Sequence, residues 1–237
     1  MPHLRQLAIG AHNPAKLAAF YEEVFELESI GAERGALFLS DGSFNLALVP
    51  ASSPADAGLL HIGFDTARAD SIRKRIARFG NGTRAITASA SPAGIDHELR
   101  DPDGNRVGLN ARGFDTAYAN RPVPIRHVAL FTPNPQQLAN FYCQLFDMKI
   151  VDSTDRSSLF VSDGEINLAL LYQRKEEPIG FNHFGFHVKN NDDMRTRAQK
   201  AGVRRGTARP QRIPFAEYRV HDPEGNGIDI SQKGWKL

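Results

Sequence analysis

Two histidines and one aspartate lie at positions where three predicted strands would turn their side chains to the same side of a sheet. In each strand the polar residue alternates with apolar residues, and successive side chains of a strand point to opposite faces. The three residues are His127, His183 and Asp229, and His187 has the same parity as His183. All of these side chains are therefore expected to face one concave surface.

Two imidazoles and one carboxylate on one side of an ion are typical of non-heme Fe(II) oxygenases, which keep coordination positions open for substrate and oxygen. The same ligand types suit Mn(II), Zn(II) and Co(II), so they do not define the metal. A cavity wall that simply carries a few polar side chains is the alternative interpretation.

The elements that must position these residues belong to a duplicated chain. The 237 residues alone allow one large domain or two small ones. Four segments of the first half recur in order in the second half: 4–21 with 125–142, 37–48 with 159–170, 61–64 with 183–186, and 101–105 with 222–226. The repeat predicts an N-terminal domain at 1–113, a linker at 114–124 and a C-terminal domain at 125–237.

Each half shows the pattern of a strand, a helix and then several strands, twice over. Asn13 and Pro14 are typical of a helix start, and Asp41-Gly42 is typical of a hairpin turn between two strands. The expected fold class is α+β, with tandem paired βαβββ units that form curved mixed sheets with helices on the outer face.

The composition is that of an ordinary globular protein, with 41% apolar and 24% charged residues and a net charge of +2. The charges are spread along the chain, so neither a nucleic-acid nor a membrane partner is expected. No apolar run is long enough to span a membrane and the first residues lack the pattern of a secretory signal, so a cytoplasmic location is expected. The single cysteine, Cys143, is expected to pack on a helix face.

These motifs resemble the vicinal oxygen chelate superfamily, which includes glyoxalases, bleomycin-resistance proteins, extradiol dioxygenases and fosfomycin-modifying enzymes. The resemblance covers almost the whole chain and is carried by three motifs: Arg126-His127-Val128, His183-Phe-Gly-Phe186, and Asp222-Pro-Glu-Gly-Asn-Gly-Ile-Asp229. It implies that His127, His183 and Asp229 are metal ligands.

The first half serves as an internal comparison for this ligand set. Its corresponding residues are Gln6, His61 and Gly108, so the first half is expected to be metal-free. Glyoxalases add a fourth ligand, a glutamate, where this chain has Ala169. The resemblance therefore implies three ligands and favours an extradiol-type dioxygenase plan.

The chain departs from the extradiol pattern at several positions. The carboxylate is Asp229 in place of the usual glutamate, and Leu168 and Arg219 stand where ring-cleaving enzymes have an acid–base histidine and a tyrosine. Parity suggests substitutes: His187 for proton transfer, and Arg219 for holding an anionic oxygen of the substrate. His221 has the same parity as Arg219 and is a further catalytic candidate.

The first hypothesis is a cytoplasmic, metal-dependent oxidoreductase, most like an Fe(II) ring-cleaving dioxygenase that acts on a small aromatic diol or another oxygen-chelating substrate. Mn(II), Zn(II), Ni(II) and Co(II) are alternative metals, and a homo-oligomer is left open. The second hypothesis is a glyoxalase-like or fosfomycin-resistance-like isomerase, lyase or transferase. The third is a metal-free protein that binds a small molecule.

Overall fold

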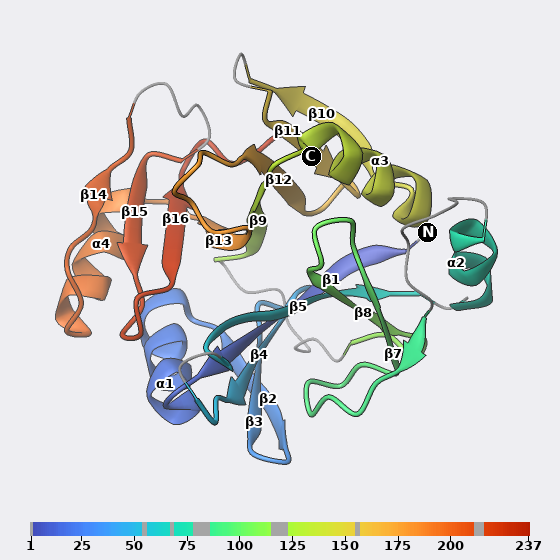
Figure 1. Cartoon of the computed structure of the whole chain (residues 1–237). Helices are drawn as coiled ribbons and strands as arrows, with labels where there is room; N and C mark the ends of the chain where they lie inside the picture. Colours follow the sequence, from blue (N-terminus) through green and yellow to red (C-terminus); the bar gives the residue numbers. More distant parts are fainter. Residues whose placement is uncertain are drawn as a thin grey trace.

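The computed structural model describes residues 2–53, 56–66, 69–77, 86–114, 123–154, 157–210 and 216–237. Within these residues each half forms one sheet of eight strands, and the two sheets lie side by side (Figure 1). The α+β fold of paired, repeated units expected from the sequence is confirmed. Residues 115–122, most of the predicted linker, lie outside the described residues.

The first half contains two strand–helix–strand units. The elements of the first unit are β1 (His3–Ala11), α1 (Pro14–Phe25), β2 (Glu28–Glu33), β3 (Ala36–Ser40) and β4 (Asn45–Pro50). Those of the second unit are β5 (Gly58–Asp65), α2 (Ala69–Ile76), β6 (Thr87–Ala88), β7 (His97–Arg100) and β8 (Arg106–Asn110).

The second half repeats this order. Its first unit consists of β9 (Ile125–Thr132), α3 (Pro135–Phe146), β10 (Lys149–Ser153), β11 (Leu159–Ser162) and β12 (Asn167–Tyr172). Its second unit consists of β13 (Gly180–His187), α4 (Asn191–Lys200), β14 (Thr207–Ala208), β15 (Tyr218–His221) and β16 (Gly227–Ser231).

The first strands of the two units meet at the centre of each sheet. The order is β2-β3-β4-β1-β5-β8-β7-β6 in the first half and β10-β11-β12-β9-β13-β16-β15-β14 in the second. The central pairs β1–β5 and β9–β13 are antiparallel, whereas β4–β1 and β13–β16 are parallel. Each sheet is therefore mixed, and β13 lies directly between β9 and β16.

The long helices start where the sequence indicates. The side chain of Asn13 accepts a hydrogen bond from the backbone N–H of Lys16, and that of Asn134 accepts one from Gln137. Each cap is followed by a proline, which needs no hydrogen-bond acceptor in the first turn. The same local signal thus begins α1 and α3 at matching places in the two halves.

Aromatic side chains of the two halves stack on one another across the interface. Phe25 of α1 stacks on Phe186 of β13, and Phe146 of α3 stacks on Phe64 of β5, with ring centroids 4.0 and 3.9 Å apart. In Figure 1 the blue helix α1 accordingly lies beside the orange and red strands of the second half. Each long helix therefore covers part of the other half's sheet.

Buried hydrogen bonds also join the two halves. The Tyr21 hydroxyl donates to Asp222 at 2.7 Å, and the Tyr142 hydroxyl donates to Asp101 at 2.9 Å. Burial raises the pKa of both tyrosines well above its usual value, and the facing carboxylates raise it further. Both hydroxyls consequently stay protonated and able to donate.

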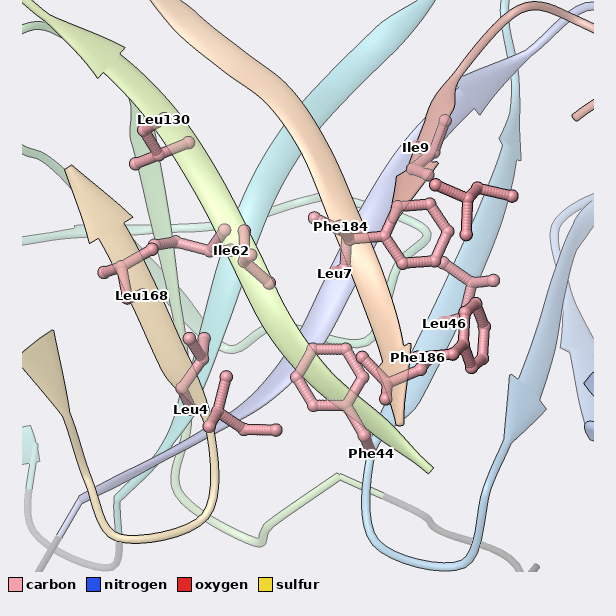
Figure 2. Close-up of a cluster of buried hydrophobic side chains, with 14 of the residues drawn as sticks. Leu4, Leu7, Ile9, Phe44, Leu46, Ile62, Leu130, Leu168, Phe184 and Phe186 are labelled. Carbon is pink, nitrogen blue, oxygen red and sulfur yellow. The ribbon is translucent and has the colours of Figure 1, made fainter. Parts of the chain in front are cut away.

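The apolar faces of both sheets share one hydrophobic core. Figure 2 shows Leu7 and Leu46 of the first half in the same cluster as Leu130 and Phe184 of the second. Because the helices and this core occupy the convex sides, the concave sides remain for polar residues. No helix in the described part of the chain is long and apolar enough to cross a membrane.

Candidate metal centre of the second half

Three neighbouring strands bring the predicted ligands together. His127 lies on β9, His183 on β13 and Asp229 on β16, and Gly185 of β13 pairs with both His127 and Asp229. Nε2 of His127 is 3.2 Å from Nε2 of His183, which is 3.1 Å from Oδ2 of Asp229. All three residues are at most 4% exposed.

Two asparagines orient the imidazoles. Oδ1 of Asn167 lies 3.0 Å from Nδ1 of His127, while Nδ2 of Asn167 donates to the Lys236 carbonyl, which fixes the amide orientation. Oδ1 of Asn182 lies 2.5 Å from Nδ1 of His183. An amide oxygen only accepts, so these partners assign the proton of each ring to Nδ1.

With both protons on Nδ1, the two Nε2 lone pairs and the Asp229 carboxylate point toward one another. Lone pairs at these distances repel unless a cation lies between them. Two neutral imidazoles held through their other nitrogen, together with one carboxylate, form a ligand set that divalent metals accept. The donor set therefore fits a metal ion.

Burial keeps the histidines neutral. It lowers the pKa of His127 to about 3, with His183 contributing in the same direction. It also lowers the pKa of His183, against the opposing effect of Asp229. Burial by itself would raise the pKa of Asp229, but its charged neighbours lower it overall. Because His183 is neutral, we attribute the ionised state of Asp229 chiefly to Arg219.

Arg219 binds the third ligand directly. Its Nε donates to Oδ1 of Asp229 at 2.5 Å, and Nε of Arg209 lies 3.7 Å from the same oxygen. Among the described residues, no group of three or more His, Cys, Asp or Glu side chains already has the spacing of a metal site. We attribute this to the Arg219–Asp229 bond, which an ion would have to displace.

The C-terminal segment covers His127. The Trp235 ring stacks on the His127 ring, with centroids 4.9 Å apart and planes inclined by 7°. This packing requires a glycine beneath it, because a Cβ at Gly185 would lie 2.7 Å from the indole. Trp235 is only 9% exposed and shields the site from water.

The three residues predicted to be catalytic lie at different places. Arg219 contacts Asp229, as described above, but His187 is exposed and its Nε2 lies 3.2 Å from the Gln232 carbonyl oxygen. His221 is also exposed and lines a separate hollow of about 560 Å³ with Lys16. The structure therefore brings only Arg219 into contact with the predicted ligands.

Sequence reasoning missed the parts played by Asn167, Asn182 and Trp235. Asn167 donates to the Lys236 carbonyl and at the same time orients His127. A signal for Trp235 was present in the duplication, since Phe114 is its counterpart in the first half. Both aromatic residues cover a glycine of the central strand.

Comparisons with known proteins define the family to which this fold belongs. The sequence profile of the Glyoxalase/Bleomycin resistance protein/Dioxygenase superfamily matches residues 3–109 and 125–230. The chain therefore belongs to this superfamily and contains two copies of its domain. No curated protein matches the sequence.

Solved structures of similar fold include a Mn(II)-bound glyoxalase from Novosphingobium aromaticivorans, with 18% identity, a TM-score of 0.72, and coverage of 99% of this chain and 83% of that one. A 2,3-dioxygenase from Pseudomonas sp. KL28 shows 17% identity, a TM-score of 0.71, and coverage of 100% and 93%. A halotolerant catechol dioxygenase shows 15% identity, a TM-score of 0.73, and coverage of 99% and 88%. At these identities the likeness establishes the fold.

Proposed function

We propose that the protein is a metal-dependent enzyme whose second half holds a divalent ion at His127, His183 and Asp229. The observation that carries the proposal is the convergence of two buried imidazole Nε2 atoms and one carboxylate, separated by 3.2 and 3.1 Å. The preferred reaction is that of an extradiol-type Fe(II) dioxygenase acting on a small aromatic diol. The similarity in fold to dioxygenases supports this choice.

A divalent ion held by His127, His183 and Asp229 would supply Lewis-acid chemistry and, in the case of Fe(II), one-electron chemistry. The remaining work belongs to the chain. Asn167 and Asn182 hold the two rings in the tautomer that presents Nε2. Trp235 excludes water from one side of His127.

Arg219 is the residue we assign to orienting the substrate. Its Nη2 is buried and makes no hydrogen bond within the described residues. When Asp229 turns toward an ion, Nε of Arg219 is also released, and the guanidinium can then bind a phenolate or carboxylate oxygen with two parallel donors. His187 remains a prediction as a proton-transfer group, and His221 remains a prediction as a catalytic residue.

A metal-free binding protein is the second candidate, and the Arg219–Asp229 bond is the observation that favours it. Loading the protein with Fe(II), Mn(II) or Zn(II) without oxygen, followed by metal analysis, separates the two. We expect about one ion per chain, lost in His183→Ala and kept in His61→Ala. Failure of all three metals to bind would exclude the metal-dependent proposal.

Oxygen uptake with a panel of catechols and hydroquinones tests the reaction. The Fe(II)-loaded protein should consume oxygen with at least one diol, and His183→Ala should not. Retained iron without uptake for any diol would exclude ring cleavage and favour the glyoxalase-like alternative.

A further inference from the structure

The first half carries an open cavity that the proposed metal chemistry does not use. Its volume is about 890 Å³, and its lining includes Gln6, Phe38, Asn45, Arg112 and Phe114. Cavities that bind small molecules usually measure roughly 300–1,000 Å³. The cavity is therefore large enough for a ligand with one or two rings.

The floor of this cavity has no room for a metal-ligand set. A Cβ at Gly108, the counterpart of Asp229, would lie 2.6 Å from Ile95 and 3.0 Å from the His61 ring. Gln6, the counterpart of His127, receives a hydrogen bond at 2.7 Å from Nε2 of His61 and donates to Asn45 and Ala93. The floor is thus neutral, and the amide of Gln6 is already engaged.

The walls offer aromatic surface. Phe38 packs on a patch of small buried side chains that includes Ala8 and Ala47. The Phe114 ring lies over Gly63, where a Cβ would be 2.7 Å from its Cζ. Both rings are partly exposed. Small residues beneath them let both rings lie close to the sheet, and the exposed parts of the rings favour contact with a planar ligand.

The formal charges of the lining balance, with Glu33 and Asp96 against Arg34 and Arg112, but their contacts differ. Glu33 pairs with Arg34 at 3.7 Å, and Oδ2 of Asp96 accepts the backbone N–H of Ala111 at 2.9 Å. Arg112 is exposed, and its guanidinium has no hydrogen bond or ion pair with any described residue. A fork of free donors at the rim of a cavity that also contains two aromatic side chains suits an aromatic carboxylate.

We propose that the first half is a metal-free binding site for a planar aromatic carboxylate, whose ring packs against Phe38 and Phe114 and whose carboxylate binds Arg112. This site is separate from the trio in the second half. It would give the chain a second small-molecule function that does not depend on the metal proposal.

Calorimetric titration of the full chain with biphenyl-4-carboxylate tests the proposal, with biphenyl-4-carboxamide as the neutral probe. We expect saturable binding of the acid that is about tenfold weaker for the amide and about tenfold weaker for Arg112→Ala, the usual effect of losing one charge-assisted contact. The matched control is Arg100→Ala, since Arg100 is an exposed arginine of the same half that binds the Gly104 carbonyl. It should bind like the unmodified chain.

The only tryptophan of the chain, Trp235, reports which half binds. When Trp235 is excited at a wavelength that the probe does not absorb, its emission should stay constant during the titration. The variant His183→Ala should bind the acid as the unmodified chain does. Quenching of Trp235 together with lost binding in His183→Ala would place the ligand in the second half and overturn the proposal. Absence of binding, or equal binding by Arg112→Ala and by the amide, would also overturn it.

Discussion

Replacing Arg219 by methionine should make the protein less stable without metal and a tighter metal binder. Arg219 now donates to Oδ1 of Asp229 at 2.5 Å, and a metal ion would have to displace this bond. A charge-assisted hydrogen bond is worth about 1.5–3 kcal/mol. Removing it should therefore raise metal affinity by about 10- to 100-fold.

The same change leaves Asp229, which is 1% exposed, without its principal cation. Breaking a buried ion pair from one side costs about 3 kcal/mol, so the metal-free variant should unfold at lower urea concentration. Competition with a Zn(II) chelator gives the affinity, and urea unfolding with and without Zn(II) gives the stability.

Arg209→Met is the matched control, because Arg209 lies 3.7 Å from the same oxygen and its loss should change the affinity much less. A folded Arg219→Met protein that binds Zn(II) no more tightly than the unmodified chain would refute the competition between Arg219 and the ion. Weaker binding would show that Arg219 supports the site.

Three further predictions test the ligands, the interface between the halves and a buried histidine. His183→Ala should lose stoichiometric metal, measured after desalting, whereas His61→Ala should keep it; equal retention would contradict the ligand assignment. Tyr21→Phe and Tyr142→Phe should each lower the free energy of unfolding by about 1.5–3 kcal/mol, with both halves still unfolding in one urea transition. Because burial lowers the pKa of His61 from 6.5 to about 3, the unfolded chain takes up a proton below pH 6.5 that the folded protein excludes. The titration of His61 should therefore lower the free energy of unfolding by about 1.4 kcal/mol for each unit by which the pH falls below 6.5, and His61→Gln should lose this part of the pH dependence.

The positions of the predicted ligands could be read from the sequence because strand alternation is a strict geometric rule. Val128 and Leu130 belong to the shared core, and His127 lies on the opposite face with Ala129. Phe184 and Phe186, which alternate with His183 and Gly185, likewise belong to the core. Alternation therefore identified the concave face strand by strand.

Alternation predicts the face of the sheet on which a side chain lies, but not which residues of the neighbouring strands lie beside it. His187 shares the parity of His183, but it is the last residue of β13 and meets the Gln232 carbonyl in an exposed position. His221 similarly lies at the end of β15, opposite Gly227 and away from Asp229. Proximity along the strand depends on register, and β13 is bulged against β9, which no local pattern predicted.

The contacts between the two halves could not be predicted from local sequence patterns either. Tyr21 is separated from Asp222 by 201 positions, and each residue has an ordinary local explanation, as part of a helix face or a turn. Only the assembled sheets show that the Asp-Pro turn of one half caps the helix tyrosine of the other. The predicted separate domains are thus joined by a common core.

Cross-strand neighbours explain why the two concave faces differ in chemistry. In the second half Arg219 pairs with Asp229 across β15 and β16, so the buried carboxylate has a cation beside it. In the first half Glu98 pairs with Gly108 across β7 and β8, and Glu98 binds Arg106. A carboxylate at position 108 would face another carboxylate, and like charges directly opposite are destabilising. The neighbouring strand therefore disfavours a carboxylate at position 108, while the shared hydrophobic core joins the two halves.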